Sequence, residues 1–320
     1  MTAVLSFRNA IRDGLAEEME RDESVFLIGE DVEPGGVFNV TPDLHARFPK
    51  RVIDTPISEL AFTGAAFGAA VRGLRPVVEI MFADFLGLVL DTLVNQAAKY
   101  WYLSGEQASV PLVVRSAVGA GGRLGACHSQ TPTGWFLGEP GLKLVAPSNA
   151  ADAKGLIKAA VRDDNPVVYF EHKMLYGLKS DVPDGDTVVP IGKAAVVREG
   201  ADVTLVGAMA MVAVATRAAE QLAGEGINAE VLDLRTLRPL DDEGIAASTA
   251  KTKRLVVVEE GPPTGGYAAD VLAIAAESVD GLRARRVSAP DLPAPFAGPL
   301  EDWWRPDVDQ VVEAATELTR

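Results

Sequence analysis

The chain has 320 residues, of which 48% are hydrophobic and 23% charged, and its formal net charge is −15. This length predicts about two domains, and the composition excludes disordered, fibrous and repetitive proteins. The negative charge and the lack of a Lys/Arg cluster argue against nonspecific nucleic-acid binding. The apolar runs are too short, and too often interrupted by acids, to span a membrane. A single cysteine, Cys127, and an N-terminus without a signal pattern predict a reducing, cytoplasmic location.

The first half alternates short apolar strands with helices, the pattern of a parallel α/β sheet. We expect strands at 24–30, 75–80, 111–117, 142–147 and 166–171, a short strand ending at 54, and helices at 7–21, 59–72, 84–103 and 150–162. Ser148 and Asn149 provide the cap signal for the last of these helices. A polar, Pro/Gly-rich stretch at 178–191 indicates the connection to a second domain.

The second half repeats this alternation on a smaller scale. We expect strands at 201–209, 227–235, 254–261 and 284–289, and helices at 211–223, 265–279 and 308–318. The strands are almost continuously apolar, as strands buried on both faces should be. The chain is therefore predicted to be an α/β protein with domains at 1–180 and 196–320 and a linker at 181–195.

Residues 51–85 place one carboxylate, Glu59, in apolar surroundings. Glu59 opens a helix that continues with the small residues GAAFGAA, and the next strand leads to Phe82 and Phe85. A carboxylate beside a flat apolar wall suits a planar nitrogen heterocycle that needs a proton acceptor. The alternative is that Ser58 caps the helix and Glu59 serves the helix dipole.

The loop from Gly119 to Trp135 is too glycine-rich to belong to a core, and its backbone is expected to bend closely around another group. His128, near its far end, is a candidate acid or base; the alternative is a solvated loop histidine. The glycines read GxGxxxG and are followed by His-Ser-Gln-Thr-Pro instead of an apolar helix, so a dinucleotide fingerprint is not indicated.

At 159–168 a helix ends in Asp163, Asp164 and Asn165 before Pro166 starts a strand. This pattern is typical of a helix stop, but carbonyls beside Asp and Asn side chains also suit a monovalent cation. Three histidines and one cysteine give no zinc spacing. No Gly-Asp-Gly stretch with a later Asn is placed to bind a diphosphate through magnesium, since the DGD at 184–186 falls in the linker.

Several long motifs occur together in one order: DTPISE (54–59), GLRPVVEIMFADF (73–85), HSQ (128–130), DAKGLIKAAVRDDNPVV (152–168) and VLDLRTLRPLD (231–241). With them the chain resembles the beta chain of the thiamine-diphosphate-dependent component of 2-oxo acid dehydrogenase complexes. The acetoin dehydrogenase beta chain is a close sister. The resemblance implies a transketolase-like pyrimidine-binding domain with a doubly wound, mostly parallel sheet, followed by a smaller transketolase C-terminal α/β domain.

The resemblance also implies roles for single residues. Glu59 would bind a ring nitrogen of the aminopyrimidine, with Leu60 and Phe85 also binding the cofactor, and His128 would help bind substrate and pass the acyl group to lipoyl. The family's potassium site would match Leu112, Ala160, Val161, Asp163 and Asn165, mostly through main-chain oxygens.

The implied partner is an alpha chain that holds the diphosphate and magnesium in an α2β2 heterotetramer. A lipoyl-bearing dihydrolipoyl acyltransferase core would dock on the C-terminal domain, including the acidic segment 301–309. The substrate is a 2-oxo acid or, alternatively, acetoin.

Two other classes remain as alternatives. A nicotinamide-dependent dehydrogenase would need a glycine fingerprint that opens a helix. A noncatalytic scaffold would have lost the site, against which the presence of Glu59, Phe85 and His128 speaks.

Overall fold

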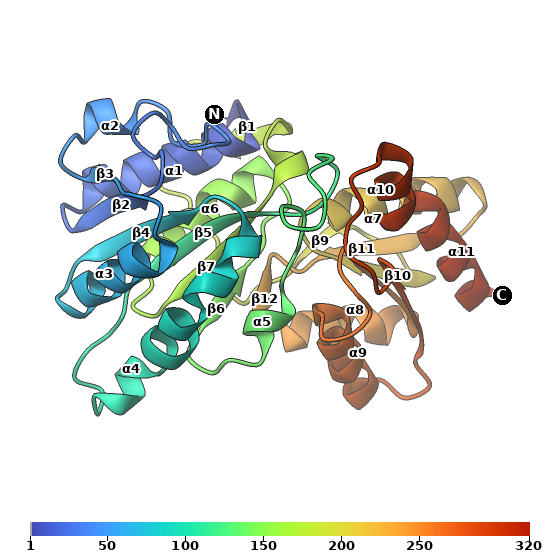
Figure 1. Cartoon of the computed structure of the whole chain (residues 1–320). Coiled ribbons are helices and arrows are strands. Elements are labelled where there is room, and N and C mark those ends of the chain that lie inside the picture. The colour runs from blue at the N-terminus through green and yellow to red at the C-terminus, as the bar shows by residue number, and fades with distance from the viewer. Residues whose placement is uncertain (1) are drawn as a thin grey trace. The chain divides into compact units, whose positions relative to one another are not determined.

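The chain, described from residue 2 to residue 320 by a computed structural model, divides into two compact units (Figure 1). The first comprises residues 1–118 and 138–191, and the second comprises residues 119–137 and 192–320. The sequence predicts continuous domains at 1–180 and 196–320, whereas the structure groups residues 119–137 with the second unit. This segment forms hydrogen bonds there, from Ala120 N to Glu260 and from Thr133 Oγ1 to Glu259.

The first unit is built on a sheet whose strands run in the order β6-β7-β5-β4-β2-β3. These strands are β2 (Val25–Gly29), β3 (Val52–Asp54), β4 (Arg75–Ile80), β5 (Val113–Val118), β6 (Lys143–Val145) and β7 (Val167–His172). All neighbouring pairs in this order are parallel. The central strands are almost entirely buried, as their continuous apolar sequences predict.

Helices cover both faces of this sheet. α3 (Glu59–Val71) connects β3 to β4 and α6 (Ala150–Arg162) connects β6 to β7, so these crossovers run in opposite directions along the sheet. Because parallel crossovers are right-handed, α3 and α6 lie on opposite faces (Figure 1). α1 (Phe7–Arg21) packs against α6, and Gly14 permits the close approach, since a Cβ there would lie 2.6 Å from Ile157 Cγ2.

Arg115 links three adjacent strands of the sheet. From β5 it donates to Glu171 on β7, at 2.6 Å from Nε and 2.7 Å from Nη2, and its Nη1 donates to Glu79 on β4. All three side chains are buried. Burial raises the pKa of Glu79 although Arg115 opposes the shift. Burial alone would lower the pKa of Arg115, but the two carboxylates raise it.

The polar stretch predicted as a connection contains a strand. β8 (Lys179–Pro183) pairs antiparallel with β1 (Thr2–Ser6), which the sequence analysis also missed. Both strands are largely exposed, so neither has the apolar run that predicts a buried strand. The first unit extends to residue 191, and the expected linker at 181–195 therefore begins within it.

Residues 83–103 are helical, but they do not form the single α-helix expected at 84–103. A 3₁₀ helix (Ala83–Val89), a π-helix (Asp91–Ala97) and α4 (Ala98–Leu103) follow one another. The Asp91 carboxylate accepts hydrogen bonds from Asn95 and Gln96, four and five residues later. These contacts stabilise the wider turn of the π-helix.

The second unit has a sheet in the order β14-β13-β10-β11-β9. Its strands are β9 (Ala195–Arg198), β10 (Val203–Gly207), β11 (Ala229–Asp233), β13 (Arg254–Glu259) and β14 (Arg283–Ser288). Only the edge strand β9 is antiparallel to its neighbour. Both sheets together confirm the predicted α/β class with mostly parallel strands.

The helices of the second unit form two pairs. α7 (Ala210–Gly224) packs with α11 (Val308–Thr319), and α8 (Asp242–Thr252) packs with α9 (Tyr267–Ser278). The sequence predicts all of these except α8, whose buried face is mostly hydroxyl-bearing. The hydroxyl of Thr252 there lies within hydrogen-bond distance of the hydroxyl of Thr204 on β10, at 2.9 Å, so the helix lacks the apolar stripe that would reveal it.

The remaining elements of the two units are short. They are α2 (Leu44–Arg47), α5 (Gly134–Leu137), a 3₁₀ helix (Lys173–Leu175), β12 (Thr236–Arg238) and α10 (Gly298–Trp304).

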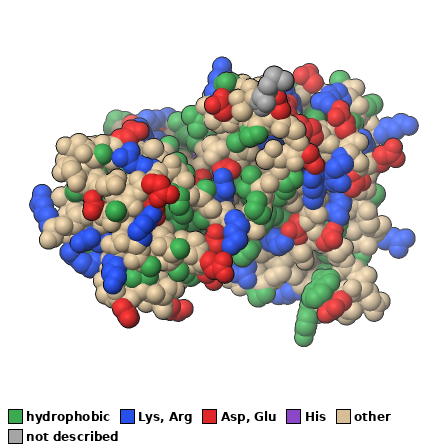
Figure 2. Space-filling view, turned by 180° about the vertical axis from the view of Figure 1, so that it is seen from behind, with side chains coloured by type: hydrophobic (Ala, Val, Ile, Leu, Met, Phe, Trp, Pro, Cys, Tyr) green, Lys and Arg blue, Asp and Glu red, His purple; other side chains and the backbone are tan. Residues whose placement is uncertain are grey.

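On the face drawn in Figure 2, basic and acidic side chains are interspersed among apolar and neutral ones. Within residues 2–320, no helix combines the length and apolar character needed to cross a membrane.

Arg115→Ala is expected to lower the free energy of unfolding by about 3 to 5 kcal/mol, because it leaves two buried carboxylates without a counter-charge. The matched control is Arg285→Ala, which removes an exposed ion pair with Glu317 and should cost less than about 1 kcal/mol. Urea titration of both variants and the wild type measures the difference. A loss for Arg115→Ala as small as that of the control would contradict the role of the buried network.

Candidate active site

The predicted cofactor carboxylate, Glu59, is the first residue of α3. The chain leaves β3 at Asp54 and enters the helix after Ser58. Ser58 occupies the N-cap position of α3, but its side chain makes no capping hydrogen bond, and the helix-dipole alternative for Glu59 stays a prediction. Glu59 is half-buried at a helix N-terminus, where the partial positive charge of the backbone favours a carboxylate.

A second carboxylate, Glu30, is close enough to Glu59 for their charges to interact. It follows β2, the strand that pairs with β3, and it is 7% exposed. The Ser58 backbone N–H donates to this carboxylate, while burial and the charge of Glu59 raise the pKa of Glu30. Its Oε1 atom is buried without a hydrogen-bond partner among the described residues. The sequence analysis missed Glu30, although an acid directly after an apolar strand is a usable signal.

Aromatic rings in the same unit form a connected wall. Phe85 meets Phe82 edge to face with centroids 5.9 Å apart, and Phe82 meets Phe38 in the same way at 5.3 Å. Phe38 stacks on Tyr176 at 5.3 Å, and the Tyr176 hydroxyl donates to Glu171 at 2.9 Å. This chain of contacts ties Phe85 to the buried charge network at the centre of the sheet.

Two further residues shape this wall. Gly36 has φ +75°, and a Cβ there would lie 2.5 Å from Glu79 Oε1, so only glycine lets the segment before Phe38 approach the buried network. Lys173 Nζ lies 5.6 Å from the centroid of the Phe82 ring. A cation over the face of the ring stabilises its position.

These groups fit the aminopyrimidine part of thiamine diphosphate. The fit rests on the buried Glu30 oxygen, which lacks a partner within the described residues and lies near the half-buried Glu59. Leu60, adjacent to Glu59 on α3, is 54% exposed and offers apolar surface. Glu59, Leu60 and Phe85 all belong to the first unit, and their roles stay predictions.

His128 lies in the second unit, on the glycine-rich loop. It is half-buried, and its backbone N–H donates to Gly125 O at 3.3 Å. Gly125 has φ +71°, and a Cβ there would lie 2.3 Å from Phe296, so the loop folds tightly against the ring. Cys127 beside it is exposed.

An open cavity of about 710 Å³ lies against this loop, within the second unit. Its lining includes Ser129 and Thr131 from the loop and residues 261–262, 264–266 and 291–294. The hydroxyls of Ser129 and Thr131 are buried without a hydrogen-bond partner among the described residues. Water or another polar group is therefore needed there.

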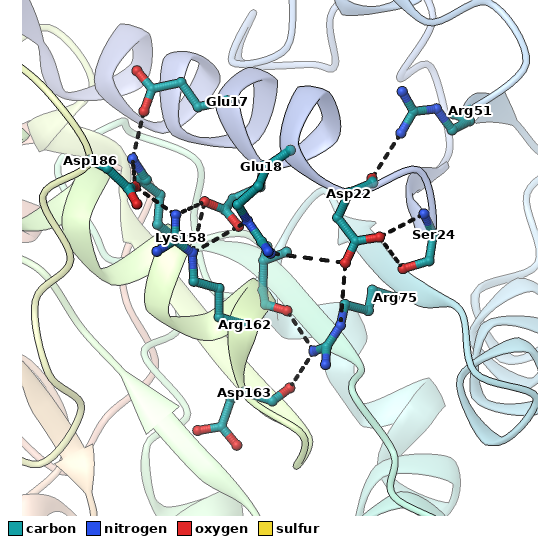
Figure 3. Close-up of polar contacts among 12 residues, drawn as sticks. Glu17, Glu18, Asp22, Ser24, Arg51, Arg75, Lys158, Arg162, Asp163 and Asp186 are labelled. Carbon is teal, nitrogen blue, oxygen red and sulfur yellow. Dashed lines mark hydrogen bonds and ion pairs between the residues drawn. The ribbon is translucent and has the colours of Figure 1, made fainter.

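The predicted potassium residues surround the end of α6, where the protein already places positive charge (Figure 3). Arg75 Nη1 donates to Val161 O at 2.9 Å and to Asp163 O at 3.1 Å. The Asp163 carboxylate accepts from Asn165 N at 2.9 Å and also contacts Lys143. Two of the expected carbonyl ligands thus face a guanidinium.

Ion pairs hold the same helix to α1 (Figure 3). The buried Lys158 Nζ lies 2.7 Å from Glu17 and 2.6 Å from Asp186, and Arg162 lies 2.6 Å from Glu18. The end of α6 is therefore fixed from two sides.

Glu30→Gln is expected to flatten the pH dependence of stability. Because the pKa of Glu30 is raised above its ordinary value of 4.5, the folded state keeps a proton that the unfolded state loses. Wild-type stability therefore falls as the pH rises through the raised pKa, and the variant lacks this loss. Melting temperatures between about pH 4 and pH 7 measure it.

The effect should shrink in a Glu59→Gln background, because the charge of Glu59 contributes to the shift. Parallel profiles for Glu30→Gln and the wild type would contradict the raised pKa of Glu30, and an equal effect of Glu30→Gln in both backgrounds would show that the two carboxylates are not coupled.

Comparison with known proteins identifies both parts of the chain. Residues 3–179 match the model of the transketolase pyrimidine-binding domain, and residues 192–311 match that of the transketolase C-terminal domain. A solved split-gene transketolase, described as an inactive beta4 tetramer, superimposes with a TM-score of 0.83 over 98% of each chain at 24% identity. This likeness shows the fold.

Curated relatives match along the whole chain. The beta subunit of acetoin:2,6-dichlorophenolindophenol oxidoreductase from Cupriavidus necator is 45% identical over 100% of this chain and 99% of its own length. The beta subunit of the pyruvate dehydrogenase E1 component from Rickettsia felis is 46% identical over 98% of each. The mitochondrial beta-2 subunit of the same component from Oryza sativa is 45% identical over 97% of this chain and 85% of its own. With both domains matched and such relatives along its length, the chain belongs to the transketolase-like family that contains the beta subunits of pyruvate and acetoin dehydrogenases.

Proposed function

We propose that this chain is the beta subunit of a thiamine-diphosphate-dependent dehydrogenase that decarboxylates a 2-oxo acid and transfers the acyl group to lipoyl. The observation that carries the proposal is the carboxylate pair Glu30 and Glu59 in the pyrimidine-binding domain, one oxygen of which lacks a partner within the described residues. Acetoin cleavage with acetyl transfer to lipoyl is the second candidate. It is supported equally by the acetoin relative, whose 45% identity is close to the 45% and 46% of the pyruvate relatives.

When bound, thiamine diphosphate supplies a nucleophilic carbon and a ring that accepts the electron pair released when carbon dioxide leaves. In this proposal Glu59 holds a proton between its carboxylate and a ring nitrogen of the aminopyrimidine. Burial and the nearby charge of Glu59 raise the pKa of Glu30, so Glu30 takes up a proton more readily than an ordinary glutamate. Phe85 and Leu60 offer apolar surface to the ring, and His128 binds substrate or lipoyl.

Exposed apolar surface supports a partner chain. On α3, Ala65 and Gly68 are exposed, and a Cβ at Gly64 or Gly68 would meet no atom within 4 Å. On α4, Tyr102 and Leu103 are 80% and 69% exposed. Large exposed apolar surfaces mark protein interfaces. We propose that a separate alpha chain covers them in an α2β2 heterotetramer and supplies the ligands of the diphosphate and magnesium.

The lipoyl-bearing acyltransferase core is proposed to dock on the acidic segment 301–309. Asp307 and Asp309 are exposed there and would attract a basic partner, more weakly at high salt. Asp302 is also exposed but is already paired with Arg123, and Glu301 is buried and paired with the same arginine. A reducing, cytoplasmic location remains part of the proposal, in keeping with the single, unpaired Cys127.

Glu59→Gln is expected to slow exchange of the thiazolium proton by ~100 to 10,000-fold in the complex with the alpha chain, because the amide keeps the shape but loses the charge. If Glu59 serves only the helix dipole, the change costs about 0.3 to 1 kcal/mol of stability and little rate. Proton exchange and melting temperature, measured on the same preparation, separate these outcomes. An unchanged exchange rate would end the assignment of Glu59 as the cofactor carboxylate.

The substrate is identified by a separate measurement, the turnover of pyruvate, branched-chain 2-oxo acids and acetoin by the wild-type chain in complex with the alpha chain.

We also propose a monovalent cation at the end of α6, bound mostly through main-chain oxygens by Leu112, Ala160, Val161, Asp163 and Asn165. The hydrogen bonds that Asp163 Oδ1 accepts from Asn165 N and Nδ2 support it by fixing the turn. Arg75 competes for two of the oxygens.

The wild type should therefore melt at a higher temperature in potassium chloride than in tetramethylammonium chloride of equal strength, and Asp163→Ala should abolish the difference. If the two salts give the same melting temperature for the wild type, Arg75 alone supplies the charge at this turn.

A further inference from the structure

Three glutamates of the second unit are almost completely buried. Glu259 ends β13, Glu260 follows it, and Glu301 lies on α10, with 2%, 3% and 0% of their surfaces exposed. A buried carboxylate is costly unless it is paired or hydrogen-bonded. Each of these three finds a partner in the glycine-rich loop 119–137, and each does so at a different point.

The middle of the loop is held through Arg123. Its backbone N–H lies 3.2 Å from Glu301 Oε1, and its Nη1 donates to Glu301 Oε2 at 2.8 Å and to Gly298 O at 2.7 Å. Its Nη2 donates to both oxygens of Asp302 at 2.8 and 2.9 Å. Backbone and guanidinium are thus fixed by one short helix, so the loop cannot move here without breaking charged hydrogen bonds.

The two ends of the loop are held by the neighbouring glutamates. At the start, Ala120 N donates to Glu260 Oε1 at 2.7 Å. At the far end, Thr133 Oγ1 donates to Glu259 Oε1 at 3.2 Å. Glu259 also accepts from Tyr267 N at 3.0 Å, which ties this end to the start of α9.

The middle of the loop has few apolar side chains to bury. Ser129, Thr131 and Thr133 line the cavity of about 710 Å³, and glycines at 121, 122 and 125 give the backbone little side-chain surface to bury. A segment with few apolar contacts opens locally unless other interactions hold it. Here the buried carboxylates are those interactions.

We infer that Glu259, Glu260 and Glu301 are positioning residues that hold loop 119–137, and with it His128, in one conformation. His128 lies five residues after Arg123 and five before Thr133, midway between two anchors. The relevance to acyl transfer rests on the proposed role of His128, whereas the anchoring itself does not.

Trypsin tests the anchoring, because Arg123 is followed by Leu124 and is a potential cleavage site. Cleavage there should be slow in the wild-type chain. Glu301→Gln and Asp302→Asn should each raise its rate by at least about tenfold, since each weakens charged hydrogen bonds to Arg123. Glu317→Gln, which removes an exposed ion pair with Arg285 in the same unit, is the matched control and should leave the rate unchanged.

The histidine signals in an NMR spectrum report directly on the environment of His128. The chain has three histidines, His45, His128 and His172, and a His128→Gln variant assigns the signal. In Glu260→Gln and Glu301→Gln the His128 signal should shift or sharpen, while His45 and His172, in the first unit, should not change. If Glu301→Gln fails to fold, Asp302→Asn carries the test, because Asp302 is exposed.

Unchanged cleavage after Arg123 together with an unchanged His128 signal in the folded variants would overturn the inference. A separate measurement addresses the proposed function: acyl transfer by the complex of His128→Ala with the alpha chain. Full transfer there would refute the role of His128, and the result of the trypsin assay would still stand.

Discussion

The first unit depends on one buried interaction, the Arg115 guanidinium held between Glu79 and Glu171. Three adjacent strands each contribute one charged group, so the interaction fixes their register as well as satisfying the charges. Neither carboxylate could remain buried and ionised without the guanidinium. Glu171 also accepts the Tyr176 hydroxyl, and Tyr176 stacks on Phe38. The position of the aromatic wall therefore follows from the charges buried behind it.

In the proposed function, the groups at the candidate site form only part of a cofactor site. Glu30 and Glu59 are proposed to provide acid–base chemistry and Phe85 an apolar face, while one Glu30 oxygen finds no partner in the described chain. Exposed Leu60 and the small-residue face of α3 add surface that a second chain can cover. The relatives are named as beta subunits, which agrees with a partner chain.

The strands and helices that the sequence predicts correctly are those determined by a local pattern of apolar and capping residues. β4, β5 and β7 are continuous apolar runs, and α6 begins at the Asn149 cap. β1 and β8 escaped prediction because their stability comes from pairing across the chain, and their residues are largely exposed. Glu30 is not predicted because the carboxylate near it, Glu59, lies on α3, well separated from it in sequence. The sequence pattern predicts Glu301 as a surface acid, since only its contact with Arg123, far away in sequence, reveals its burial.

The central claim is that this chain holds the pyrimidine half of a thiamine diphosphate site and needs an alpha chain to complete it. The most direct test is thiamine-diphosphate-dependent turnover of pyruvate and of acetoin, measured for the purified chain alone and for the chain co-expressed with its alpha chain. The account predicts no turnover of either substrate by the chain alone and turnover of one of them by the pair. Release of carbon dioxide from pyruvate, or of acetaldehyde from acetoin, by the chain alone would contradict it.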